Sequence, residues 1–144
     1  MRFKCIKLKI GAIDFDATAD VRFGSLTAGN GTFDINAGND INFVNAVSSS
    51  DIDMVAIGSI NGGDLVATNT LNLTGGNIAI GDASASSINF TSATDILFDI
   101  ITSPNAISLS AVNGMIGANT GNGDIGTKPA DYELLGPFRV VYPY

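Results

Sequence analysis

A five-residue alternating unit recurs at near-constant spacing along this chain, and it constrains the fold more than any other feature. Each copy has an apolar residue, a variable residue, a second apolar residue, another variable residue and a small residue. Copies start 17 to 20 residues apart, at Ile13, Phe33, Ile52, Leu71, Ile88 and Ile107. Because alternation with a period of two indicates a short strand with one buried face, the chain contains a strand-forming repeat.

A second apolar unit lies between successive copies of the first, and a third, mostly apolar position follows it. The second unit starts at Val21, Ile41, Ile60, Ile78, Ile96 and Ile116. The third position falls at Leu26, Ala46, Leu65, Ala83 and Ile101. Each period therefore contains about three short inward-facing segments, bounded by Gly, Asn, Asp or Ser. A chain that wraps once per period needs this recurrence, because equivalent residues then lie above one another at about 4.8 Å.

The sequence predicts an all-β fold, a parallel β-helix (solenoid) of about 6–7 coils with a period of roughly 19 residues. Residues 12–127 carry the repeats, residues 1–11 are expected to form an N-terminal capping or junction strand, and residues 128–144 a C-terminal cap or linker. One predicted apolar column contains Phe15, Ile35, Met54, Leu73, Phe90 and Leu109. A predicted column of small residues contains Ala17, Ala37, Ala56, Gly75, Ser92 and Ala111.

Composition excludes several kinds of chemistry. The chain has no His and a single Cys, Cys5, so it lacks His-based acid–base groups, Ser-His or Cys-His nucleophiles and any Cys/His zinc site. Seven basic against fourteen acidic residues give a net charge of −7, which argues against nucleic acid as a partner. No run approaches the roughly 20 apolar residues of a membrane helix. Residues 1–10 lack the apolar stretch of a signal peptide, so a signal for export would lie outside this chain.

Turn segments rich in Gly, Asn and Asp carry a family resemblance. These segments are residues 37–41 (Ala-Gly-Asn-Asp-Ile), residues 75–78 (Gly-Gly-Asn-Ile) and residues 121–127 (Gly-Asn-Gly-Asp-Ile-Gly-Thr), the last followed by Lys128 and Pro129. Together with the period of about 19 residues, over residues 12 to 129 they resemble the haemagglutinin repeats of filamentous-haemagglutinin-type exoproteins exported by two-partner secretion. No segment matches the secretion-signal domain or a toxin tip of that family.

The resemblance implies a right-handed parallel β-helix that is secreted or displayed on the surface of a Gram-negative bacterium. It implies a role in adhesion, biofilm formation or contact-dependent interaction. The partners would be a protein or glycan on a host or bacterial surface, and the neighbouring coils of a longer parent chain. We expect a structural or display segment of a surface adhesin without enzymatic activity, without a cofactor and without insertion into a membrane.

Two alternatives remain open from the sequence. The first is a passive spacer that binds no partner of its own. The second is a carbohydrate-active β-helix, a polysaccharide lyase or hydrolase, because Asp20, Arg22 and Asp40 would share one outer face. A surface ion pair is the simpler explanation of that trio, and no long loop insertions wall off a cleft of the size that substrate sites usually need. We therefore assign no catalytic, cofactor-binding or metal-binding residue.

An outward column of carboxylates is the other candidate. Asp14, Asp34 and Asp53 would stack about 4.8 Å apart and repel one another by about 1 kcal/mol per neighbouring pair even in water. A cation such as Ca²⁺ could relieve that repulsion, but a solvated polar face is the favoured explanation of the column. The Gly-Asn-Gly segments at residues 29–31, followed by Asp34, and 121–123, followed by Asp124, resemble calcium-binding nonapeptides only in part. Turn residues that supply positive φ are the favoured explanation.

Overall fold

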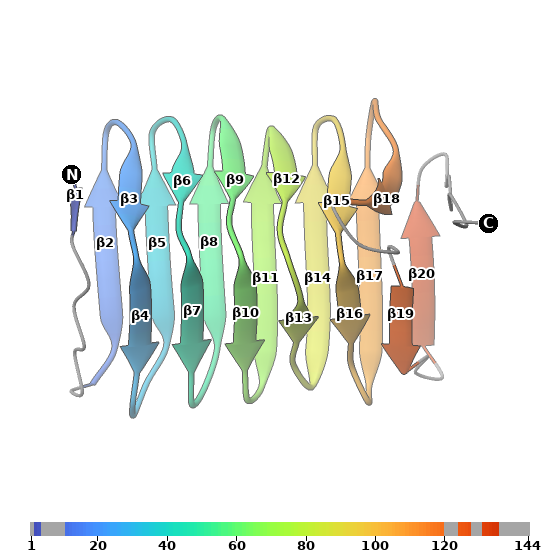
Figure 1. The fold of residues 1–144 in the computed structure, drawn as a ribbon, viewed down its shortest axis with the longest axis horizontal. Helices are drawn as coiled ribbons and strands as arrows, with labels where there is room; N and C mark the ends of the chain where they lie inside the picture. The colour runs from blue at the N-terminus through green and yellow to red at the C-terminus, as the bar shows by residue number, and fades with distance from the viewer. Residues whose placement is uncertain (1, 4–10, 120–123, 128–130, 136–144) are drawn as a thin grey trace.

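The computed structural model is a right-handed solenoid of about six turns, in which three parallel sheets enclose one core (Figure 1). It describes residues 2–3, 11–119, 124–127 and 131–135, with side chains described within 11–119 and at Ile125. Every strand pairing in these residues is parallel, and no helix occurs among them. The described part of the chain accordingly has no helix with the length and hydropathy to cross a membrane. The predicted fold class is confirmed.

The first sheet contains the longest strands and corresponds to the five-residue unit. Its order is β2 (Ile13–Ala17), β5 (Phe33–Ala37), β8 (Ile52–Ala56), β11 (Thr70–Gly75), β14 (Ser87–Ser92), β17 (Ala106–Ala111) and β20 (Asp131–Leu135). In β5, β14 and β17 buried side chains alternate with partly or fully exposed ones, because one face of the sheet lies on the core.

The second sheet corresponds to the second apolar unit. Its order is β1 (Arg2–Phe3), β3 (Val21–Phe23), β6 (Ile41–Asn42), β9 (Ser59–Asn61), β12 (Asn77–Ala79), β15 (Ile96–Phe98) and β18 (Ile116–Ala118). The third sheet corresponds to the third apolar position. Its order is β4 (Ser25–Ala28), β7 (Asn45–Ser48), β10 (Asp64–Ala67), β13 (Ala83–Ser84), β16 (Ile100–Thr102) and β19 (Asp124–Thr127).

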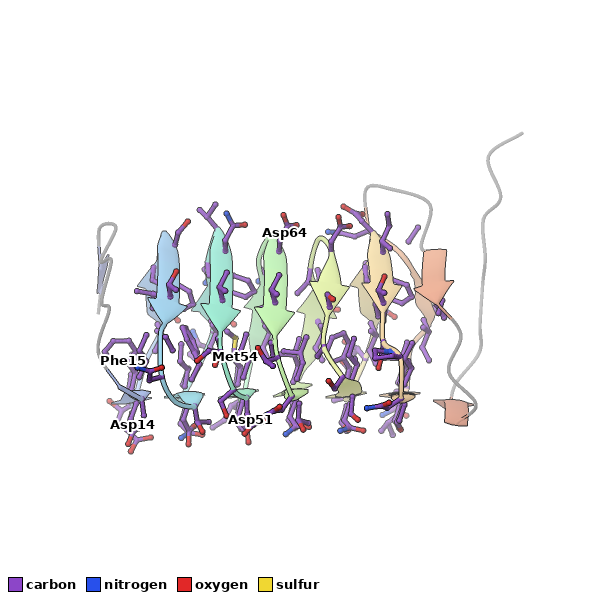
Figure 2. The ribbon with its side chains drawn as sticks, turned by 90° about the horizontal axis from the view of Figure 1, so that it is seen from below. Asp14, Phe15, Asp51, Met54 and Asp64 are labelled. Carbon is purple, nitrogen blue, oxygen red and sulfur yellow. The ribbon has the colours of Figure 1, made fainter. Side chains whose placement is uncertain are left out.

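The predicted register is confirmed. Phe15 aligns with Ile35, and Ile35 aligns with Met54, in successive strands of the first sheet. Ile35 and Met54 are fully buried, and Phe15 in the first coil packs partly buried against the same core. Figure 2 shows Phe15 and Met54 inside the rod, whereas Asp14 lies on its outside. Each coil therefore buries its apolar side chains against the coils above and below it.

In one column of the core, the side chains of neighbouring coils are complementary in size. The rings of Phe23 and Phe43 stack with centroids 5.4 Å apart and an interplanar angle of 14°. The next residue in this column is Gly62, and the ring of Phe43 occupies the space that a side chain at position 62 would need. The aromatic ring and the glycine are thus a complementary pair, which keeps the core close-packed at this corner.

Strand pairing continues into the predicted terminal segments. Arg2 and Phe3 align with Arg22 and Phe23, so β1 extends the second sheet. The strand β20, within the segment predicted as a cap or linker, pairs with β17 over five residues. The rest of the predicted capping strand (residue 1 and residues 4–10) and of the C-terminal segment (residues 128–130 and 136–144) lies outside the described residues.

Candidate functional surfaces

Carboxylates at the corner between the first and second sheets accept hydrogen bonds from the backbone of the next coil. The Oδ1 atom of Asp20 accepts from the backbone N–H of Asp40 at 3.4 Å. The Oδ1 atom of Asp40 accepts in turn from the backbone N–H of Ser59 at 2.7 Å. Four coils along from Asp20, Asp95 accepts from the N–H of Met115 at 2.8 Å. Each carboxylate thereby satisfies a backbone donor at a bend, where sheet pairing is interrupted.

At the other two corners, side-chain oxygens also accept hydrogen bonds from the backbone of the next coil. Asn45 accepts from the N–H of Asp64 at 3.2 Å, and Asp64 accepts from the N–H of Asp82 at 3.1 Å. At the third corner, Asp51 accepts from the N–H of Thr70 at 2.9 Å. We call these acceptors the corner ladder, namely Asp20, Asp40, Asn45, Asp51, Asp64 and Asp95.

The corner ladder is not among the predicted sites, although a sequence signal for it exists. Each of its members directly precedes the first inward residue of a segment, as in Asp20-Val21, Asp51-Ile52 and Asp64-Leu65. A polar acceptor at that position recurs with the period of the coil. The acidic composition of the chain is therefore partly structural.

The structure brings together the trio predicted for a carbohydrate-active site. Arg22 forms an exposed ion pair with Asp20, with 3.0 Å between Nη2 and Oδ2, and Asp40 lies in the next coil. A hydrogen bond from the side chain of Asn39 lowers the pKa of Asp20, with a further contribution from the Asp40 backbone N–H and a smaller one from Arg22. A general acid needs a raised pKa, so this carboxylate is suited to accept hydrogen bonds rather than to donate a proton.

The predicted carboxylate column is present on the outer face of the first sheet. Asp14 aligns with Asp34, and Asp34 with Asp53. Burial raises the pKa of Asp34, and the negative charges of Asp53, Asp14 and Asp16 raise it further. The amide of Asn36 donates to Asp34 at 3.2 Å and opposes this shift only in part. Ionisation of Asp34 therefore costs more in the folded chain than in the unfolded one.

Farther along the same column the carboxylates give way to amides. Asp53 aligns with Asn72, and Asn72 with Asn89. The side-chain nitrogen of Asn89 donates to the oxygen of Asn72 at 3.0 Å. Across the described residues, no group of three or more acidic, His or Cys side chains has an arrangement that could hold a metal ion, and this includes the column of Asp14, Asp34 and Asp53.

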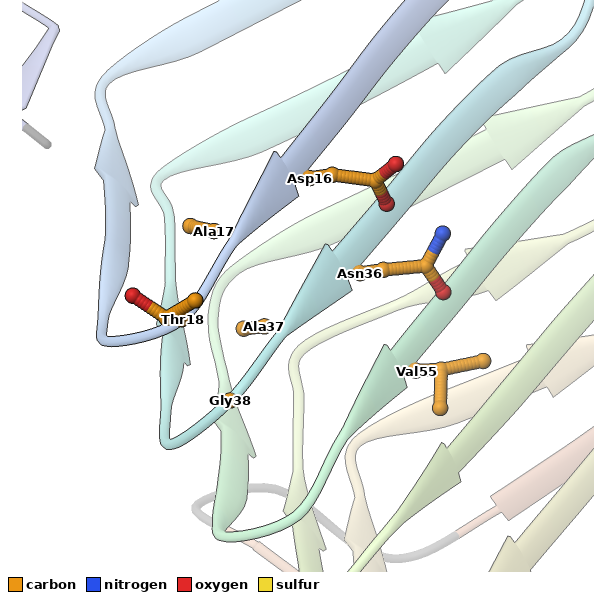
Figure 3. Close-up of a pocket in the computed structure, with 7 residues that line it drawn as sticks. All are labelled: Asp16, Ala17, Thr18, Asn36, Ala37, Gly38 and Val55. Atoms are coloured by element: carbon orange, nitrogen blue, oxygen red, sulfur yellow. The ribbon is translucent and has the colours of Figure 1, made fainter.

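Two shallow depressions that open to solvent lie on the outer faces. The first measures about 300 Å³ and lies beside the corner after the first sheet; its lining residues are Asp16, Ala17, Thr18, Asn36, Ala37, Gly38 and Val55. Figure 3 shows Asp16, Asn36 and Val55 side by side on successive strands. The second measures about 340 Å³ on the third sheet; its lining residues are Asp64, Leu65, Val66, Asp82, Ala83, Ser84, Ile100 and Thr102.

The fold and its surfaces define a parallel β-solenoid with a continuous apolar core, polar corners and no deep cavity among the depressions described above. Comparison with models of protein families, with curated proteins and with solved structures returns no significant match to this chain. The assignment of function therefore depends on the geometry and on the sequence motifs.

Proposed function

We propose that this chain is a structural and display segment of a secreted bacterial surface adhesin of the filamentous-haemagglutinin type. In this role the stacked coils hold outer side chains at fixed positions along a rod. The observation that carries the proposal is the unbroken register of three parallel sheets over residues 11–119. The partner would be a protein or glycan on a host or bacterial surface.

Short connections support a rod over an enzyme. Between residues 13 and 118 no connection between consecutive strands exceeds four residues. Substrate sites are usually clefts that bury most of their ligand, and such short connections leave the two depressions shallow and open. The carbohydrate-active alternative rests on Asp20, Arg22 and Asp40 alone, and both carboxylates of that trio accept backbone hydrogen bonds.

An adhesion assay with the whole chain separates an adhesin from a passive spacer. Beads coated with the chain are incubated with epithelial cells and with bacterial cells, and bound beads are counted. The control coat carries Leu73→Asp, which places a charge in a fully buried column and unfolds the solenoid. We expect the folded coat to adhere and the control coat to match bare beads. Equal adhesion of all three would favour the spacer.

An activity assay tests the enzymatic alternative. The chain is incubated with acidic polysaccharides, and new reducing or unsaturated ends are measured. Release of such ends by the chain, and its loss in Arg22→Ala, would contradict the proposal. Export is tested by the genomic neighbourhood, where we expect a parent gene that extends beyond both ends of this sequence and lies beside a gene for an outer-membrane transporter.

A further inference from the structure

The outer face of the third sheet carries a stripe of short side chains whose middle is apolar, with Ile100 in the neighbouring column. Val47, Val66 and Ile100 point outward with relative exposures of 38%, 45% and 42%. Val47 and Val66 align in register, and the same column continues to Ser84 and Thr102. Thr27 aligns with Val47 at the other end of the column. The side chains of this column are all short, so the surface that they form across five coils projects little from the sheet.

The stripe contains the second depression because one strand contributes a small side chain. Ser84 lies between Val66 and Thr102 in the column, and its strand β13 has only two residues. Ile100 lines the same depression from the neighbouring column, in which it follows Asp64 and Asp82, and the depression measures about 340 Å³. An aliphatic side chain of moderate length fits such a space.

Two carboxylates lie on the same side of the depression, at the corner where β10 and β13 begin. Asp64 and Asp82 are exposed and line it, and Figure 2 shows Asp64 on the outside of the rod. One oxygen of Asp64 accepts the backbone N–H of Asp82, whereas the carboxylate of Asp82 has no hydrogen-bond or ion-pair partner among the described side chains. Negative charge and apolar surface thus occur together.

Within residues 11–119 no cation is placed to neutralise these carboxylates. Residues 11–119 contain eleven Asp and one basic residue, Arg22. Arg22 is on the second sheet and forms its ion pair with Asp20. A second copy of this face would bring carboxylates against carboxylates, so charge complementarity requires a basic partner.

We propose that this face docks an extended, basic segment of a partner protein through the depression between Val66 and Ile100. A Lys or Arg side chain lays its aliphatic stem on Val66 and Ile100 and places its charge beside Asp64 and Asp82. Asp64 and Val66 are two positions apart at β10, and so are Asp82 and Ser84 at β13, which matches the same-face spacing of an extended peptide. This inference names a partner class for the display role proposed above.

Binding of synthetic peptides to the whole chain tests the inference without cells. The probe is a peptide in which Lys and Val alternate along one face, with Thr at the intervening positions. The control peptide carries Glu in place of each Lys. We expect the Lys peptide to bind in isothermal titration or fluorescence anisotropy, and to bind more weakly as salt rises. We expect no binding of the Glu peptide.

Substitutions locate the site. Asp82→Asn should weaken binding by about fivefold, the upper end for one exposed ion pair. Ser84→Arg should abolish it by filling the depression with positive charge. The matched control is Asp16→Asn, which removes a carboxylate from the other depression and should leave the affinity unchanged. Binding of the two peptides with equal affinity, no binding of either, or an equal loss in Asp16→Asn would overturn the inference. Bead adhesion is measured separately, so failure here leaves the adhesin proposal standing.

Discussion

The corners and the outer face of the first sheet both carry carboxylates stacked from coil to coil, but their neighbours differ. At a corner, Asp20 and Asp40 each face a backbone N–H of the next coil. On the face, Asp34 lies between Asp14 and Asp53. The pKa of Asp20 is lowered and that of Asp34 is raised. The same residue type therefore stabilises one part of a solenoid and destabilises another, depending on what the adjacent coil presents to it.

Among the changes that test this comparison, removal of a corner acceptor should have the largest effect on the free energy of unfolding. Asp40→Ala leaves the N–H of Ser59 without its 2.7 Å acceptor. We expect a loss of about 1–3 kcal/mol in the free energy of unfolding, measured by chemical denaturation. Asp40→Asn keeps an acceptor oxygen and should lose less. If Asp40→Ala and Asp40→Asn both retained full stability, the corner ladder would have no structural role.

Removal of a face carboxylate should have the opposite sign. Asp34→Asn ends the repulsion with Asp14 and Asp53 and keeps an acceptor for Asn36. We expect the free energy of unfolding to rise by about 1 kcal/mol at neutral pH. The matched control is Asn89→Asp, which breaks the amide contact with Asn72 and should lower stability. A destabilised Asp34→Asn protein would show that the column is not strained by charge.

The two groups of carboxylates should also differ in pH dependence. The pKa of Asp34 is raised above its ordinary value of 3.8, so the folded chain binds the extra proton and stability falls as pH rises from 3.8 through the raised pKa. The pKa of Asp20 is lowered below 3.8, so stability falls as pH drops from 3.8 through the lowered pKa. Melting temperatures measured across this pH range test both assignments. In Asp34→Asn the loss of stability with rising pH should disappear, and in Asp20→Asn the loss of stability with falling pH should disappear. Unchanged profiles would contradict both assignments.

Salt should have the smallest effect. Screening weakens repulsion between exposed charges as the Debye length shortens from about 10 Å at 0.1 M to about 3 Å at 1 M. We expect added salt to raise the melting temperature of the native chain more than that of Asp34→Asn, as followed by circular dichroism. An equal response in the two proteins would place the relevant repulsion elsewhere on the rod.

The core could be predicted from sequence because each position of the repeat shows by itself whether its side chain is apolar. Ile35 and Met54 occupy equivalent positions of the repeat, and stacking is the arrangement that buries both. Prediction of the outward column succeeded for the same reason, since Asp14, Asp34 and Asp53 are fixed by the strands that contain them. Because successive side chains of a strand point to opposite faces, the same period of two identifies both the inward and the outward residues.

The corners could not be predicted in the same way. The trio Asp20, Arg22 and Asp40 left a carbohydrate-active alternative open. Sequence shows which side chains are near one another but not which backbone N–H groups lack partners at a bend. The depression on the third sheet depends on Ser84 being short between Val66 and Thr102. That relation involves three coils at once and becomes visible only when the register is known.

Pairs of engineered cysteines test the register most directly. In a Cys5→Ser background, Asn72→Cys with Asn89→Cys places the thiols on paired residues of adjacent strands, within the Cα separation of about 4.4–6.8 Å that a disulfide needs. Asn72→Cys with Ser108→Cys spans two strand spacings, roughly 9.6 Å. The stacked register predicts rapid oxidation to an intramolecular disulfide in the first pair and none in the second. Equal oxidation of the two pairs, or none in the first, would contradict the stacking on which the solenoid depends.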